Sequence, residues 1–268
     1  MHTLDTLRDL DVPAVTTIVV VVAVAALVAL DPALGRRQYA GFVADLATAD
    51  GDLGRDQVRR RLYRSWTWQG WLTGVLVVAA VLVLPGIGLT DLGLRLPDLG
   101  ILLPAADRDD ATGMAVGAVV GITLAVGALV LLRRRLPADF RPPHSAAADA
   151  LWPTTRAACR GWAGLSFSAG VTEEVSYRGL LVLALALAVP GLPDLAFVAV
   201  AAILFGLAHW YQGRLGMLAT GALGALFTQL YLATGSLLLP MVLHVLVDLR
   251  PLLDRPARSG APVPADAR

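Results

Sequence analysis

The only two glutamates of this 268-residue chain are neighbours. Glu173 and Glu174 lie inside a long apolar segment, and Arg178 follows four residues after Glu174. Residues four apart on an α-helix share a face, so Glu174 and Arg178 can form an ion pair. Glu173 is rotated by about 100° from that face and has no such partner. A buried carboxylate without a cation is a stronger base than one in water, so Glu173 is a candidate general base. The alternative is a purely structural polar contact between helices.

Two histidines lie further along the chain, each with a companion four residues away. Phe205 and His209 share one helix face, and His244 and Asp248 share another. Asp248 could orient the tautomer of His244, or both groups could act on a third one. Each pair also has a non-catalytic interpretation. His209 ends an apolar segment and could be an interfacial residue, and His244 with Asp248 could be a satisfied polar pair.

Together these groups suit two chemistries. In the first, a zinc ion held by His209 and His244 activates a water molecule for hydrolysis. In the second, which needs no metal, Glu173 and His209 activate the water directly while His244 and a neighbour stabilise the oxyanion. No serine lies where it could act as a nucleophile, and Cys159 is interpreted as a residue at the membrane interface that takes no part in the chemistry. Both chemistries remain open at this point.

The composition indicates which class of protein must position these groups. Hydrophobic residues make up 56% of the chain and charged residues 16%, whereas soluble proteins average roughly 45–50% and about 25%. We therefore predict an all-α, polytopic helical membrane protein in contact with the lipid bilayer. The net charge of +1 gives no support for nucleic-acid binding. The single cysteine excludes an intrachain disulfide and a thiolate zinc site.

Seven apolar runs predict about seven membrane spans. They extend from about Val12 to Leu30, Trp66 to Leu89, Gly113 to Leu132, Gly161 to Val189, Leu195 to Trp210, Leu215 to Ala233, and Ser236 to Leu249. A charged group in hydrocarbon costs on the order of 2.5–3.5 kcal/mol by insertion scales. The first, second, third and sixth runs avoid ionisable groups, whereas the fourth, fifth and seventh contain charged residues or histidines. This segregation predicts a site among the latter three.

The connecting segments predict the orientation. Residues 31–65 hold seven arginines and residues 133–160 hold six, whereas residues 90–112 hold five aspartates and two arginines. The N-terminus is therefore predicted outside and the C-terminus in the cytoplasm, with the site in the cytoplasmic leaflet. Residues 40–64 are predicted to form an amphipathic surface helix. All 22 basic residues are arginine, a bias typical of a GC-rich bacterium, so we expect a bacterial cell membrane.

The three motifs, in order, resemble those of the CPBP intramembrane proteases. That family includes the type II CAAX prenyl endopeptidases and the bacterial Abi or bacteriocin-processing proteins. Its pattern is Glu-Glu-x-x-x-Arg, then Phe-x-x-x-His, then His-x-x-x-Asn or Asp, here found from Glu173 to Asp248. The resemblance covers about residues 160–250. It implies an all-helical endopeptidase with a catalytic core at residues 141–250, after N-terminal membrane helices and loops at 1–140. The composition of the C-terminal end, rich in Pro, Ala and Arg, predicts a disordered cytoplasmic tail at 251–268.

The resemblance also implies roles for the residues. Glu173 and His209 would activate the water, His244 and residue 248 would stabilise the oxyanion, and Glu174, Arg178 and Phe205 would support them. The family has been described as metalloproteases, and a glutamate-dependent mechanism without metal also fits. The CAAX-processing branch usually has Asn where this chain has Asp248, so Asp248 must be protonated, orient His244 or bind a metal. We expect a peptide or membrane-protein substrate, since bacteria generally lack prenylated CAAX proteins.

Two functions outside this class compete with the peptidase. A non-catalytic immunity or scaffold protein would use the polar cluster to bind a peptide or a partner helix. A proton-coupled transporter would use it as a proton relay, but the polar groups are predicted at one depth and form no path across the bilayer. The sequence does not predict the oligomeric state.

Overall fold

The computed structural model describes residues 2–97 and 146–253, and these two ranges contain helices and no strand. The all-α prediction is confirmed. The third predicted span, at residues 113–132, lies outside the described residues. The elements are α1 (His2–Arg8), α2 (Ala14–Thr48), α3 (Gly51–Val83), α5 (Ala146–Leu151), α6 (Arg156–Glu173), η2 (Glu174–Leu180), α7 (Leu181–Ala188), α8 (Asp194–Ala208), η3 (Trp210–Gln212), α9 (Gly213–Thr234), α10 (Leu238–Asp248) and α11 (Arg250–Leu253).

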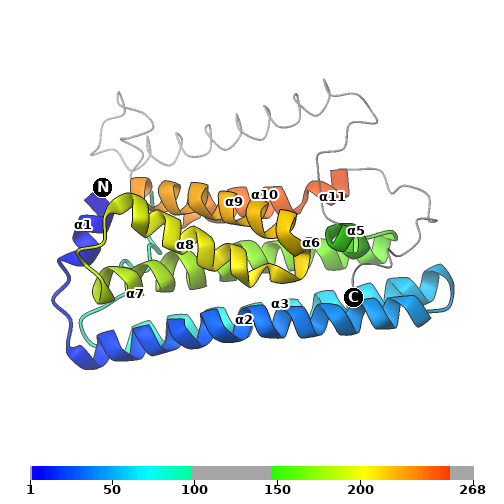
Figure 1. The fold of residues 1–268 in the computed structure, drawn as a ribbon, viewed down its shortest axis with the longest axis horizontal. Helices are drawn as coiled ribbons and strands as arrows, with labels where there is room; N and C mark the ends of the chain where they lie inside the picture. Colours follow the sequence, from blue (N-terminus) through cyan, green and yellow to red (C-terminus); the bar gives the residue numbers. More distant parts are fainter. Residues whose placement is uncertain (1, 98–145, 254–268) are drawn as a thin grey trace, which may run out of the picture.

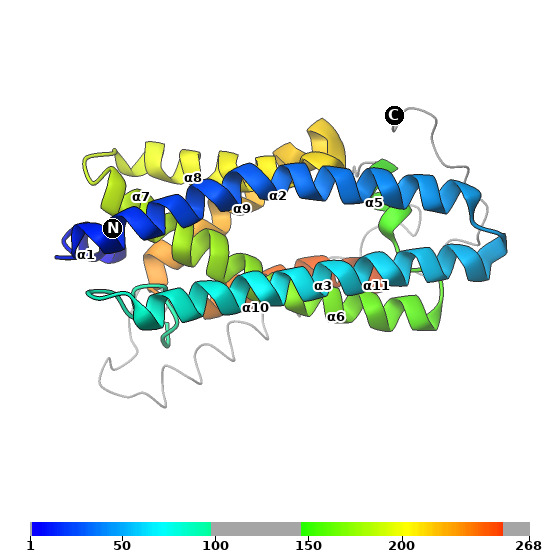
Figure 2. The same cartoon turned by 90° about the horizontal axis from the view of Figure 1, so that it is seen from below.

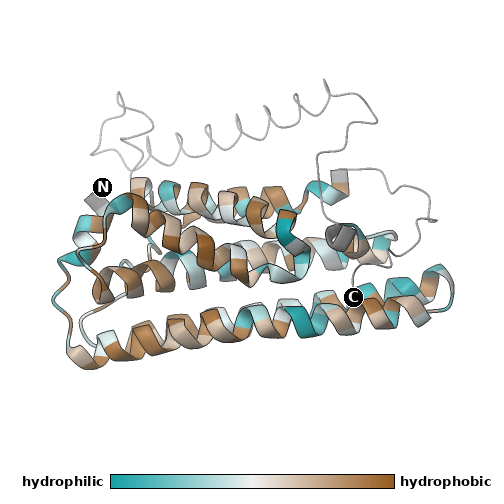
Figure 3. Ribbon diagram, viewed as in Figure 1, coloured by the Kyte–Doolittle hydropathy of each residue, from teal (hydrophilic) through white to brown (hydrophobic). Residues whose placement is uncertain are grey.

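Helices α2 and α3 form a long antiparallel hairpin along one side of the molecule (Figure 1). Helix α2 has 35 residues, about 52 Å at 1.5 Å per residue, which exceeds the roughly 30 Å of a bilayer core. It continues past the apolar run because good helix formers such as Ala, Leu, Arg and Gln fill its second half. The surface helix predicted for residues 40–64 is therefore wrong, since this segment is the polar end of the hairpin (Figure 3).

The second predicted span also has different limits. Helix α3 begins 15 residues before Trp66 and ends at Val83, six residues before the predicted end. The reason for the early end is Pro85, because a residue that precedes proline avoids the helical region, and Leu84 is indeed extended with ψ 131°. The loop that follows packs inward, and Arg95 Nε donates a hydrogen bond of 2.7 Å to the carbonyl of Gly235.

Helices α6, η2 and α7 follow one another without a break over residues 156–188, close to the predicted fourth span. Their middle part, η2, is wound as a π-helix, in which the Leu181 N–H donates to the carbonyl of Ser176, five residues earlier. All seven residues of η2 are buried. Helices α3 and α10 pack against α6, and α2 packs against α7. Helix α6 therefore runs beside α3, while α7 lies on the α2 side of the bundle (Figure 2).

Helices α8, α9 and α10 complete the bundle and correspond to the fifth, sixth and seventh predicted spans. Helices α2, α3 and the segment Trp210–Thr234 are long and apolar enough to cross a membrane. Helix α8 is shorter, and α10 has only 11 residues, about 16 Å, so α10 alone does not cross the bilayer core. The chain is an integral membrane protein of helical type.

The C-terminal tail predicted for residues 251–268 begins within a helix. Residues 250–253 form the short helix α11, so the boundary at residue 251 falls inside a helical turn. Residues 254–268 lie outside the described part of the chain. Helices α2 and α3 pack directly on the later helices, and the predicted boundary at residue 140 lies outside the described residues.

Candidate active site

The two glutamates lie where α6 passes into the π-helix. Glu173 is the last residue of α6, and Glu174 is the first of η2. Side-chain hydroxyls support this junction: Ser176 Oγ donates to the Thr172 carbonyl at 2.8 Å, and Thr172 Oγ1 donates to the Ser168 carbonyl at 2.9 Å. Hydroxyls that bond a carbonyl four residues earlier bend helices, and π-turns occur frequently at functional sites. The local winding therefore marks this junction as a candidate site.

Glu174 pairs with two groups at once. Its Oε1 accepts a hydrogen bond of 3.0 Å from Arg178 Nη1 and lies 2.7 Å from His244 Nδ1. Glu174 and Arg178 are 0% and 1% exposed, and the predicted ion pair between them is confirmed. An ionised carboxylate only accepts hydrogen bonds, so Nδ1 of His244 carries the proton here. Glu174 thereby orients the ring of His244, a role that the sequence did not predict.

His209 is oriented by its own helix. Its Nδ1 lies 3.0 Å from the backbone carbonyl of Phe205, which only accepts, so Nδ1 is the donor. The Phe205 ring packs against the His209 ring at 4.8 Å between centroids, and the Arg178 guanidinium lies 3.9 Å from the Phe205 centroid. Phe205 therefore packs between the ion pair and His209.

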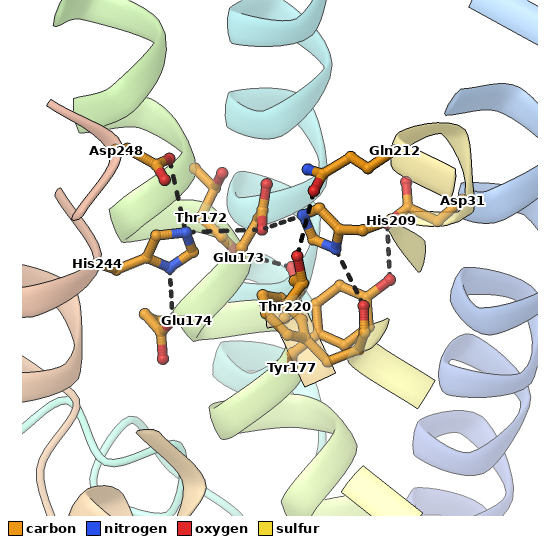
Figure 4. A network of polar contacts seen from close by, with 12 residues as sticks. Asp31, Thr172, Glu173, Glu174, Tyr177, His209, Gln212, Thr220, His244 and Asp248 are labelled. Carbon is orange, nitrogen blue, oxygen red and sulfur yellow. Dashed lines mark hydrogen bonds and ion pairs between the residues drawn. The ribbon is translucent and has the colours of Figure 1, made fainter. Parts of the chain in front are cut away.

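Glu173 points between the two imidazoles (Figure 4). Its Oε2 lies 3.6 Å from His209 Nε2 and 3.9 Å from His244 Nε2. This oxygen is buried and has no hydrogen-bond partner among the described residues. Since Nδ1 of each histidine already has a partner, the Nε2 atoms are the free edges of both rings. The structure thus brings the three predicted groups together, with one reactive edge of each facing the same point.

Asp248 also lies at this point, but not where it would orient His244. Its Oδ2 is 3.7 Å from Nε2 of His244, longer than a hydrogen bond and on the opposite side of the ring from Glu174. Its backbone carbonyl accepts a hydrogen bond of 2.7 Å from Trp162 Nε1. The orienting role considered for Asp248 therefore belongs to Glu174, and Asp248 contributes charge beside the reactive edge of His244.

A glycine sets the distance between the two helices that carry these groups. A Cβ atom on Gly170 of α6 would lie 2.9 Å from the backbone nitrogen of Val245 and 3.2 Å from the Met241 carbonyl, both in α10. Because Gly170 has no side chain, the backbones of α6 and α10 can approach closely. This contact is one residue from His244 and places it against Glu174.

The helices that carry these groups match a known protein family. Residues 156–250 match the family described as type II CAAX prenyl endopeptidase Rce1-like. They form an Rce1-like region. The predicted resemblance is thereby confirmed over these residues, and every group described so far in the site lies inside them. No curated protein and no solved structure matches the chain in the other two comparisons.

Whether the Rce1-like region could hold a metal ion depends on the arrangement of its donor groups. In the two described ranges, no group of three or more His, Cys, Asp or Glu side chains has an arrangement that could hold a metal ion. The donors nearest to such a set are His209, His244 and the carboxylates beside them, at nitrogen-to-oxygen distances of 3.6–3.9 Å. These residues do not fit a zinc site as they stand, so no step below passes through a metal.

The Rce1-like region does not enclose the site alone. A cavity of about 550 Å³ contains Glu173, His209, His244 and Asp248 in its lining, and α2 and α3 contribute further polar groups, among them Asp31, Gln38 and Gln69. Sequence analysis missed these residues. Asp31 offered a signal, since it is an acidic residue at the end of a charge-free apolar run, but that position was interpreted as the end of a span.

Proposed function

We propose that this protein is an intramembrane endopeptidase that cleaves membrane-associated proteins or peptides near the cytoplasmic interface. The observation that carries the proposal is the buried Oε2 of Glu173, which has no hydrogen-bond partner in the described chain and faces two imidazole Nε2 atoms. A buried carboxylate oxygen without a hydrogen-bond partner lowers the stability of the folded protein. General-base activation of water is the chemistry that suits it.

The distances favour a water molecule between the groups. A separation of 3.6 Å between Glu173 Oε2 and His209 Nε2 is too long for a direct hydrogen bond and invites a bridging water. Both atoms accept hydrogen bonds, since Nδ1 of His209 carries the ring proton, so such a water donates one proton to each. This directs a lone pair of the water oxygen into the cavity, toward a substrate carbonyl carbon.

The reaction then follows from the positions of the groups. The water oxygen bonds to the carbonyl carbon as Glu173 takes one of its protons, which yields a tetrahedral intermediate. Glu173 returns that proton to the amide nitrogen as the carbon–nitrogen bond breaks. Carboxyl oxygens near both ring nitrogens of His244 favour a second proton on Nε2, so the imidazolium can donate to the oxyanion.

Asp248 is compatible with this scheme as a counterion. Its Oδ2 lies 3.7 Å from Nε2 of His244, a distance at which a carboxylate stabilises an imidazolium by direct Coulomb attraction. The negative charge that would repel an oxyanion is then balanced by the histidine. The Asp at a position that is usually Asn in the CAAX-processing branch therefore does not remove the proposed activity.

The cavity indicates the kind of substrate. Its volume of about 550 Å³ and its mixture of apolar residues, such as Leu27 and Leu223, with the polar groups of the site suit a short stretch of extended peptide rather than a water-soluble ion. A transport function is less well supported, since Glu173, His209, His244 and Asp248 gather at one point. A non-catalytic peptide-binding protein remains the alternative function.

The test is cleavage by the purified protein in detergent. A library of fluorogenic membrane peptides is digested in water enriched in ¹⁸O, and the products are identified by mass spectrometry. We expect cleavage with one ¹⁸O atom in each new carboxyl group, because water is the nucleophile. Binding of peptides without any cleavage by the wild-type protein would contradict the peptidase proposal and favour the non-catalytic alternative.

A further inference from the structure

The first membrane helix carries an acidic residue that the site does not yet explain. Asp31 follows 17 uncharged residues of α2 and directly precedes Pro32. A carboxylate at such a position costs on the order of 2.5–3.5 kcal/mol by insertion scales. Within the described ranges it forms no ion pair with a cation, and its Oδ2 accepts a hydrogen bond of 2.7 Å from the Tyr177 hydroxyl.

Tyr177 connects Asp31 to the reactive groups. It lies in the π-helix η2, three residues after Glu174, and is 2% exposed. Its ring packs edge-on against Phe205 at 5.1 Å between centroids. Phe205 in turn packs on His209 and accepts a hydrogen bond from Nδ1 of that residue. The Tyr177 hydroxyl therefore joins α2 to η2, which follows directly after Glu173, and the Tyr177 ring contacts Phe205, on which His209 packs.

The part of α2 beside the site borders the cavity. Its residues Leu27, Leu34 and Gln38 line the cavity, while Leu27 also packs against the core and Gln38 accepts a hydrogen bond of 2.7 Å from Trp66 Nε1. Figure 4 shows Asp31 beside His209, on the side away from His244. The hydrogen bond to Tyr177 is thus a specific anchor across the edge of the cavity.

We propose that Asp31 is a positioning residue of the site, which acts through Tyr177 to hold the π-helix so that Glu173 points between His209 and His244. This inference rests on the proposed peptidase function and extends the site beyond the Rce1-like region to α2. Asp31 touches none of the reacting atoms in this arrangement. Its effect is on the rate of the chemical step and not on substrate binding.

The experiment compares kcat and KM of the full-length protein with those of Tyr177→Phe, Asp31→Ala, Asp31→Asn and the double variant Asp31→Ala/Tyr177→Phe. A hydrogen bond to a charged group corresponds to about a ten- to hundredfold change. We expect Tyr177→Phe and Asp31→Ala each to lower kcat by that factor, with KM within about twofold. The double variant should match the single ones, because both remove the same contact.

Asp31→Asn separates positioning from charge, since its amide oxygen still accepts the hydrogen bond. We expect its kcat to stay within about threefold of the wild type, given that a neutral hydrogen bond retains much of the interaction. The matched control is Tyr231→Phe, which removes another buried tyrosine hydroxyl, bonded at 3.3 Å to the Asp91 carbonyl and outside the cavity lining. Its kcat should equal that of the wild type.

Three results would overturn the inference while wild-type cleavage persists: full activity of Tyr177→Phe, a rise in KM at unchanged kcat, or equal losses in Tyr177→Phe and Tyr231→Phe. Thermal unfolding in detergent is recorded for every variant. If Asp31→Ala does not fold, Tyr177→Phe and Asp31→Asn, which keep the shape of each side chain, decide the question. Absence of cleavage by the wild type would instead refute the proposed function.

Discussion

Replacement of Gly170 by alanine should separate the two helices that carry the site. The new Cβ would lie 2.9 Å from Val245 N and 3.2 Å from the Met241 carbonyl, whereas nonbonded heavy atoms need about 3.5 Å. Helix α10 must therefore retreat by about 0.6 Å. The 2.7 Å contact between His244 Nδ1 and Glu174 Oε1 then stretches to about 3.3 Å, the limit of a good hydrogen bond.

The expected losses follow from this shift. Overpacking of a close contact costs about 1–3 kcal/mol of stability, and a misplacement of about 1 Å in a catalytic group can cost on the order of 100-fold in rate. We expect turnover of Gly170→Ala to fall by roughly 10- to 100-fold and its midpoint of thermal unfolding in detergent to drop.

The matched control lies on the same helix. A Cβ on Gly164 would meet nothing within 4 Å, and alanine is a better helix former than glycine. Gly164→Ala should therefore keep wild-type turnover and an equal or higher unfolding midpoint. Wild-type turnover in Gly170→Ala, or equal losses in both variants, would refute the argument that this close approach positions His244.

Three further predictions concern the polar groups. Glu174→Gln should destabilise the protein by about 3–5 kcal/mol, because it leaves the buried Arg178 charge unpaired; an unchanged unfolding midpoint in detergent would contradict this. Asp248→Asn should retain turnover within about threefold, since the imidazolium of His244 keeps Glu174 as its partner; a loss beyond tenfold would show that the charge of Asp248 is required. Dialysis against a chelator should leave turnover unchanged, measured beside the zinc content of the same sample; parallel loss of zinc and activity would restore the metal mechanism.

The sequence could predict which side chains meet at the site, because that prediction depends only on local spacing and on the hydrophobicity of each segment. Four-residue spacing places Glu174 with Arg178, and the cost of charges in hydrocarbon marks the segments that must meet. The contact between Glu174 and His244 was not predictable in this way. It depends on the register of two helices 70 residues apart, which the close approach at Gly170 sets.

Other features were not predicted because the sequence patterns assume ideal α-helical geometry. The π-helix Glu174–Leu180 is invisible to an analysis that uses 3.6 residues per turn. The length of α2 was underestimated because an apolar run marks the segment that lies in the bilayer core and not the ends of the helix. The helix continues through polar residues. Asp31 was missed for the same reason, since a charge after an apolar run resembles a span boundary. It is the helix beyond that boundary that brings Asp31 to the cavity.

The central claim is that the carboxylate of Glu173 takes the proton from the attacking water. The most direct measurement is turnover of Glu173→Gln, which keeps the shape and hydrogen-bonding capacity of the side chain but is no base. We expect a loss of at least about 100-fold in kcat, with peptide binding and the unfolding midpoint unchanged. Retained cleavage by Glu173→Gln, with the same products as the wild type, would contradict the mechanism proposed for this site.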